Sequence, residues 1–127
     1  HHPTEIEVTL DSIQLYAQLK GVENITAIWR PHKYSRTLDN MERFKECFKG
    51  SNRLVILPVW DAGEEAVEID FEGNFGSNYN LTLADRIRKE NDNLLLLKNN
   101  QVLESLHEGI IVGFGAGDIT YQLRGAC

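Results

Sequence analysis

Residues 25–37 constrain the fold of this chain more than any other stretch. Residues 25–29 form a short apolar run that is rich in β-branched side chains, and Pro31 follows almost at once. A run of this length that is closed by a proline is typical of a buried strand rather than a helix. We therefore predict a strand at residues 25–29.

Three side chains that can carry a positive charge follow this strand closely: His32, Lys33 and Arg36. In open α/β sheets, ligands bind beyond the carboxyl ends of the strands. A cluster of cationic groups at that place suits a carboxylate or a phosphate. A solvated basic loop without a ligand is the alternative interpretation.

Composition narrows the class of protein and of partner. A chain of 127 residues, with 42% hydrophobic and 25% charged residues, is expected to form one globular domain with a single core. Its apolar runs are too short for a membrane span. The net charge of -6 argues against a general nucleic-acid surface. We therefore expect a small anion as the partner.

The cysteines indicate the redox compartment of the protein, and the first residues indicate where the chain comes from. Cys47 and Cys127 have no metal-ligand spacing, so we expect reduced thiols in a cytosolic protein rather than a disulfide. The chain opens on His1 and His2 without an initiator methionine or a signal-peptide pattern, which suggests a fragment of a longer protein. A tag remnant is the alternative origin of the two histidines.

Helices and strands are predicted to alternate along the chain. Thr4 and Glu7 have capping-box spacing at the start of the first helix. Glycines and asparagines make residues 65–80 a predicted long loop. Helices are predicted at residues 5–20, 38–49, 81–90, 101–108 and 119–124, and strands at residues 25–29, 54–59, 94–97 and 110–114.

Strands that are joined by helical crossovers pair in parallel. We therefore predict an α/β fold: a Rossmann-like three-layer domain over residues 1–127, with a mainly parallel sheet and helices on both faces. The loops after the first, second and fourth predicted strands then meet at one edge of the sheet. The turn after the fourth strand leads into a predicted helix, whose first backbone amides favour an anion, although a glycine turn of this kind can also be purely structural. The residues that join the basic segment there are Asp61, Glu64, Gly115, Ala116, Gly117 and Asp118.

Several chemistries are disfavoured. No serine or cysteine nucleophile has a plausible histidine partner, which argues against a hydrolase. The histidine spacings match no common zinc pattern, so no metal site is predicted. The sequence has no P-loop pattern, and any ATP chemistry would need a phosphate site on another domain.

Four motifs carry a resemblance to a known family: HHPTEI at residues 1–6, PHKYSRT at 31–37, DAGEE at 61–65 and GAGDI at 115–119. In order and approximate spacing they resemble the HHPTE, PHRYTRT, PAGE and GAGD motifs of the carboxy-terminal domain of the Mur ligase family, in the branch that joins L-alanine to UDP-N-acetylmuramate. The resemblance spans essentially the whole chain and makes the first two histidines native. Lys33, Ser35 and Asp61 depart from it, and Lys33 matters most because lysine cannot make a planar bidentate contact.

The resemblance implies a cytoplasmic, ATP-dependent, amide-forming ligase of peptidoglycan synthesis with three domains. ATP and Mg2+ are expected to be bound mainly by the central domain, and this chain alone is expected to be inactive. The implied partners are L-alanine, UDP-N-acetylmuramate, ATP and the other two domains, with no nucleic acid and no membrane. In the implied reaction, ATP phosphorylates the UDP-N-acetylmuramate carboxylate and the alanine amine attacks the acyl phosphate.

The resemblance also assigns residues. It places His1 and His2 near the nucleotide, and it implies no catalytic residue on this chain by itself. A peptide-recycling ligase of the same superfamily is an alternative, although it lacks a PHRYTRT-like loop. A non-catalytic anion-binding module and a structural domain with the same core are further alternatives. The implied substrate-binding residues are His32, Lys33, Arg36, Gly115, Ala116, Gly117 and Asp118.

Overall fold

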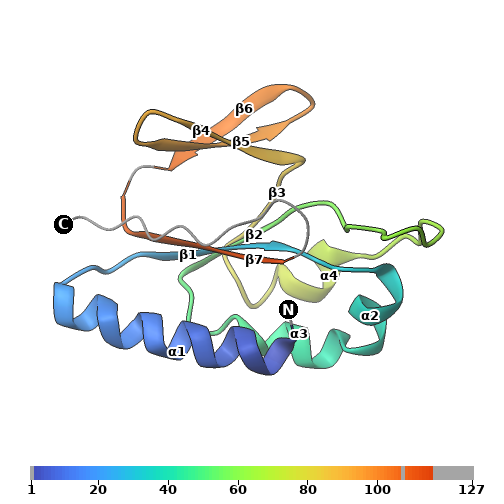
Figure 1. Cartoon of the computed structure of the whole chain (residues 1–127), viewed down its shortest axis with the longest axis horizontal. Coiled ribbons are helices and arrows are strands. Elements are labelled where there is room, and N and C mark those ends of the chain that lie inside the picture. The colour runs from blue at the N-terminus through green and yellow to red at the C-terminus, as the bar shows by residue number, and fades with distance from the viewer. Residues whose placement is uncertain (1, 107, 116–127) are drawn as a thin grey trace.

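A four-stranded parallel sheet forms the centre of the computed structural model, which describes residues 2–106 and 108–115 (Figure 1). Each neighbouring pair of strands is parallel. The first strand therefore lies in the middle of the sheet, beside the last strand described. In spatial order the strands are β3 (Leu81–Leu83), β2 (Arg53–Ile56), β1 (Ile25–Arg30) and β7 (Ile110–Gly115).

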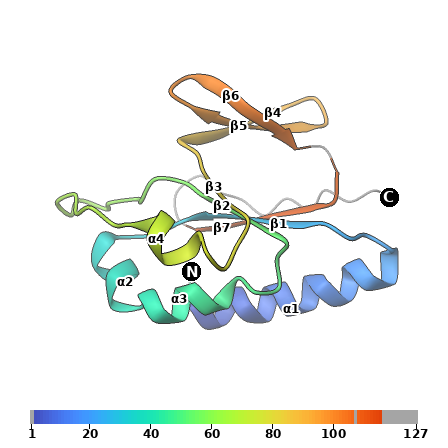
Figure 2. The same cartoon turned by 180° about the vertical axis from the view of Figure 1, so that it is seen from behind.

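Helices cover one face of this sheet, as Figures 1 and 2 show from opposite sides. Aromatic rings fill the space between: the ring of Trp29 on β1 lies 4.7 Å from that of Phe44 and 5.1 Å from that of Phe48, measured between centroids. Burial of these large side chains is the main stabilising contribution on this face. The helices are α1 (Pro3–Lys20), α2 (Tyr34–Asp39), α3 (Met41–Cys47) and α4 (Phe71–Phe75).

A small antiparallel sheet covers the opposite face, in the order β4-β5-β6 (Figure 1). Its strands are β4 (Arg86–Glu90), β5 (Asn93–Lys98) and β6 (Gln101–Leu106). Leu94 and Leu96 of β5 pack with Ile28 and Val55 of the central sheet in a second apolar core. Both faces of the parallel sheet are thus buried, which explains the uninterrupted apolar runs of its central strands.

The α/β class, the three layers and the mainly parallel sheet are confirmed, as are strands close to 25–29 and 110–114. The strand predicted at 54–59 exists as β2, but it ends at Ile56. The predicted helix at 81–90 is wrong, because this stretch forms β3 and β4. The predicted helix at 101–108 is also wrong, because its described residues form β6.

The remaining differences concern the outer layers. The predicted strand at 94–97 exists as β5, but it pairs antiparallel in the covering sheet instead of joining the parallel one. In the part of the chain that is described, one outer layer is therefore a sheet, and the prediction of helices on both faces is wrong. Residues 65–80 are mostly loop, as predicted, with α4 inside them. The predicted helix at 119–124 lies outside the described residues.

Tight turns explain why the covering sheet replaces helices. Asn99 and Asn100 have φ angles of 53° and 62° and join Lys98 to its cross-strand partner Gln101. Two successive residues with positive φ make a two-residue hairpin turn, which asparagine tolerates well. The turn between β4 and β5 contains Asn91, with φ 56°. These turns join β4, β5 and β6 into antiparallel hairpins.

The predicted span of the first helix is confirmed, but the residues that cap its amino terminus differ from the predicted ones. It begins at Pro3, and Nδ1 of His2 accepts a hydrogen bond of 3.4 Å from the amide of Thr4. The side chain of Glu5 accepts one of 3.4 Å from the amide of His2. The predicted capping box of Thr4 and Glu7 is therefore wrong, and the residue pair that satisfies the first amides lies two positions earlier.

Two further observations concern the cysteines and the possibility of a membrane span. Cys47 is a free thiol, as predicted, and burial raises its pKa to about 12, so that it is protonated and unreactive at neutral pH. Cys127 lies outside the described residues. Within 2–106 and 108–115, no helix has the length and apolar character that crossing a membrane requires.

Candidate anion-binding site

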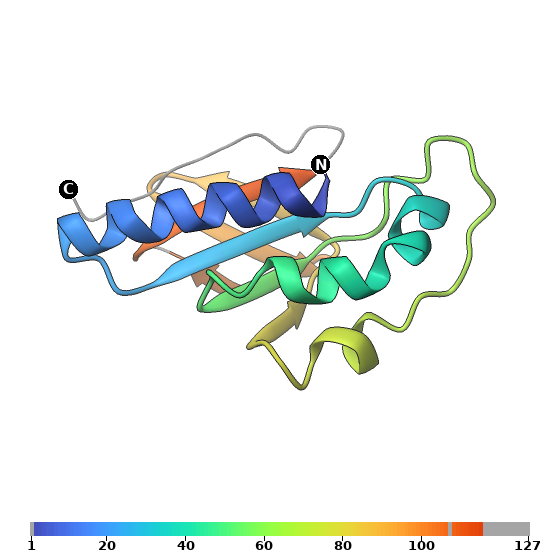
Figure 3. The same cartoon turned by 90° about the horizontal axis from the view of Figure 1, so that it is seen from below.

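The carboxyl ends of β1 and β7 lie at the same edge of the parallel sheet, beside the start of α1 (Figure 3). Arg30 at the end of β1 pairs with Gly115 of β7. Arg36 follows β1 on helix α2, so Arg36 and Gly115 belong to the same edge, as predicted. Residues 32–36, here called the cationic segment, therefore stand where parallel α/β sheets bind ligands.

The cationic segment is fixed to the loop after β2 by main-chain hydrogen bonds. The amide of Trp60 donates to the carbonyl of Pro31, and the amide of Lys33 donates to the carbonyl of Trp60, both at 2.8 Å. His32 and Trp60 thereby form an isolated parallel bridge beyond the ends of their strands. The pairing of β1 with β2 thus continues into the segment and limits its freedom to move.

Lys33 has an unusual backbone conformation, with φ 68° and ψ 140°. A side chain at positive φ is strained, and such residues cluster at functional sites. Its carbonyl accepts hydrogen bonds from the hydroxyl of Thr37 at 2.7 Å and from the amide of Thr37 at 3.2 Å. This conformation lets α2 begin at Tyr34, soon after the end of β1 at Arg30. The single helix predicted at 38–49 is therefore wrong, because α2 begins four residues earlier and a second helix, α3, follows it.

Glu64, from the loop after β2, contacts the first turn of α2. Its Oε1 accepts hydrogen bonds from the amide of Tyr34 at 2.7 Å and from the amide of Ser35 at 3.2 Å. Its Oε2 accepts one from the hydroxyl of Ser35. The hydroxyl of Ser35, followed by the two amides, lowers the pKa of Glu64 below its ordinary value, so it is a carboxylate at neutral pH.

His32 and Arg36 are neighbours within the cationic segment. Nη1 of Arg36 lies 3.4 Å from Nδ1 of His32. A guanidinium group can only donate, so Nδ1 accepts and the proton of the neutral ring is on Nε2. Burial, followed by the charge of Arg36, lowers the pKa of His32 from 6.5. At neutral pH the segment thus offers two cations, Lys33 and Arg36, and a neutral imidazole rather than three cations.

Arg30 is a site residue that the sequence prediction missed. Its Nη1 donates to the carbonyl of Pro58 at 3.3 Å, and within the described residues its buried Nε has no hydrogen-bond partner. Its position directly after the predicted strand was the available signal. Gly115 has φ 144°, and a Cβ there would lie 2.4 Å from the carbonyl oxygen of Arg30. Only glycine allows β7 to approach β1 so closely at this edge.

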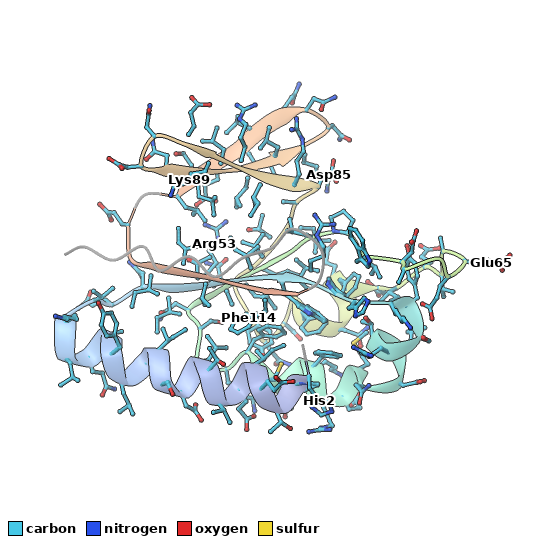
Figure 4. The ribbon with its side chains drawn as sticks, viewed as in Figure 1. His2, Arg53, Glu65, Asp85, Lys89 and Phe114 are labelled. Atoms are coloured by element: carbon cyan, nitrogen blue, oxygen red, sulfur yellow. The ribbon has the colours of Figure 1, made fainter. Side chains whose placement is uncertain are left out.

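The structure describes some of the other predicted site residues but not all of them. His2 caps α1, which begins at this edge of the sheet (Figures 3 and 4). Asp61 serves the turn of its own loop, where its carboxylate accepts a hydrogen bond of 3.0 Å from the amide of Gly63. The positions outside the described residues are His1, Ala116, Gly117 and Asp118. In 2–106 and 108–115, no three histidine, cysteine, aspartate or glutamate side chains gather as a metal site would need.

The fold and this edge define an α/β domain with a candidate site for a small anion. Among curated proteins, the chain is 53% identical over 127 residues to the UDP-N-acetylmuramate--L-alanine ligase of Helicobacter pylori strain P12. It is 50% identical over 125 residues to that of Campylobacter curvus, and 46% identical over 124 residues to that of Campylobacter jejuni subsp. doylei. In sequence the chain thus matches a part of these UDP-N-acetylmuramate--L-alanine ligases, and the predicted resemblance to them is confirmed.

These matches have a defined extent. Each covers 98% of this chain but only 27% or 28% of the relative. The chain therefore spans a little over a quarter of the length of the curated relatives it matches. No protein-family model matches the chain.

Proposed function

We propose that residues 1–127 are the carboxy-terminal domain of a cytoplasmic, ATP-dependent ligase that joins L-alanine to UDP-N-acetylmuramate in peptidoglycan synthesis. The names of the relatives support this proposal over nearly the whole chain. The observation that carries it structurally is the cationic segment, which is braced by the neighbouring loop at the ligand-binding edge of a parallel sheet.

In this proposal, the cationic segment binds alanine. A small amino acid offers mainly its carboxylate for recognition, and Arg36 and Lys33 are the two cations that the cationic segment presents to it. The neutral ring of His32 offers an N–H donor at Nε2, while its Nδ1 faces Arg36. Holding the carboxylate leaves the alanine amine directed at the carbonyl that it attacks, so the contribution of this domain is orientation.

The nucleotide is assigned mainly to another domain. The sequence contains no P-loop pattern, and the described residues form no group of metal ligands. Both observations support a division of labour in which the rest of the longer protein binds ATP and Mg2+, which supply activation of the UDP-N-acetylmuramate carboxylate. The position of His2 at the start of α1, on the edge that holds the cationic segment, supports its proposed place near the nucleotide.

The test is Arg36→Ala in the full-length ligase. Loss of a charge-assisted contact of about 1.5–3 kcal/mol should lower kcat/KM for alanine by about one to two orders of magnitude, with a smaller effect on ATP. Arg88→Ala, which removes an exposed arginine from β4 in the covering sheet, is the matched control. Steady-state kinetics with each substrate varied in turn would measure both. An unchanged kcat/KM for alanine in a folded Arg36→Ala enzyme would refute the assignment.

A further inference from the structure

We propose that Glu64 is a positioning residue for alanine: its carboxylate holds the first turn of α2 so that Lys33 and Arg36 present their charges to the ligand. This inference rests on the proposed function. Glu64 itself does not touch the ligand in this proposal. It acts through the backbone of the helix that carries Arg36.

The contacts of Glu64 are directed at the helix start and not at the cations. Its two oxygens accept from the amides of Tyr34 and Ser35 and from the hydroxyl of Ser35. Within the described residues, no salt bridge joins Glu64 to Lys33 or Arg36. An anion thus stands beside the cationic segment without direct ion pairing, and the two cations keep their capacity to bind a carboxylate.

The segment needs such a tie because its own conformation is unfavourable. Lys33 is strained at φ 68°, and α2 has only six residues, which is too short to be stable by itself. The carbonyl and amide of Trp60 hold the segment before Lys33, and Glu64 holds it after Lys33. The strained residue is therefore fixed from both sides by one loop.

The loop is shaped to deliver this carboxylate. Ala62 and Gly63 have φ angles of 52° and 90°, and the amide of Glu64 donates to the carbonyl of Asp61 at 3.0 Å. The resulting turn brings Glu64 back toward α2 after the chain has left β2. Glycine at position 63 adopts this conformation without strain.

A positioning role and simple electrostatics predict opposite changes in alanine binding when Glu64 is replaced. Glu64→Gln removes a negative charge close to the proposed carboxylate site, and Coulomb attraction alone would then strengthen alanine binding. If Glu64 orders α2, its loss must weaken alanine binding instead. The direction of the change therefore separates the two roles.

The experiment compares Glu64→Ala, Glu64→Gln and Ser35→Ala in the full-length ligase. Glu64→Ala, which removes all three hydrogen bonds to the start of α2, should raise KM for alanine about tenfold. Glu64→Gln and Ser35→Ala should have smaller effects in the same direction, because each retains part of the contact. Glu65→Gln, the same charge change at the exposed neighbour, should leave the alanine KM within about twofold.

Amide hydrogen exchange supplies a readout that does not depend on alanine. Exchange at Tyr34 and Ser35 should be faster in Glu64→Ala than in Glu65→Gln. An alanine KM that stays constant or falls in the folded Glu64 variants, while Arg36→Ala is impaired, would overturn the positioning role alone. A lack of effect of Arg36→Ala would overturn the proposed site, and the inference about Glu64 would fall with it.

Discussion

Trp29→Ala should remove the centre of the aromatic cluster under the parallel sheet. Trp29 is 1% exposed, and its ring centroid lies 4.7–6.0 Å from those of Phe44, Phe48, Phe71 and Phe75. Truncation of a buried tryptophan lowers the free energy of unfolding by about 3–5 kcal/mol. We expect the upper part of that range, because four ring contacts are lost together. With a typical urea dependence, the unfolding midpoint should fall by about 2 M.

Urea unfolding of the 127-residue chain, followed by far-ultraviolet circular dichroism, measures this change. Trp60→Ala is the matched control, because Trp60 is 45% exposed and its truncation should change the free energy of unfolding by no more than about 0.5 kcal/mol. Trp29→Phe, which keeps one ring, should fall between Trp29→Ala and the wild type. Similar midpoints for Trp29→Ala and Trp60→Ala would refute the reasoning that the cluster is central to stability.

The remaining predictions use other parts of the molecule. Gly115→Ala should destabilise the chain by more than about 1 kcal/mol in urea unfolding, because the new Cβ meets the carbonyl of Arg30, whereas Gly21→Ala, at positive φ but in open space, should cost about 1 kcal/mol or less. The hydrogen bonds from Arg53 lower the pKa of Glu104 from its ordinary value, so their contribution to the free energy of unfolding is present at neutral pH and is lost as the pH falls through the lowered pKa. Glu104→Gln should therefore reduce the loss of stability at acid pH, and an unchanged dependence of stability on pH would count against this linkage. The isolated chain should neither hydrolyse ATP nor ligate alanine, and amide formation by the pure chain would contradict the proposed division of labour.

The sequence predicted the parallel sheet because its strands are short apolar runs with clear ends. Residues 25–29 and 110–114 are buried on both faces, and this environment requires the uninterrupted apolar pattern that the prediction used. The covering sheet was missed because residues 81–90 are rich in arginine, lysine and glutamate, which favour helices locally. The available signal was the asparagine pair at 99–100, where positive φ at both residues makes a hairpin turn.

The position of the cationic segment in the fold was predictable, whereas its contacts were not. The cluster of Lys33 and Arg36 after β1 is evident in the sequence, and the rule for parallel sheets places it at the correct edge. The hydrogen bonds of Glu64 to the start of α2 depend on how two loops meet in space, which no local pattern encodes. The neutral state of His32 likewise depends on burial and on the nearby charge of Arg36.

The pairing of β1 with β7 has a consequence for how the chain folds. Ile25 lies opposite Ile110, so β1 receives one of its two neighbouring strands from a segment much later in the sequence. Closing so long a loop is entropically expensive, and contacts between distant residues slow folding. During synthesis, the edge of β1 that pairs with β7 should stay unpaired until β7 has been made. Chains that stop before β7 should therefore expose an apolar strand edge and aggregate.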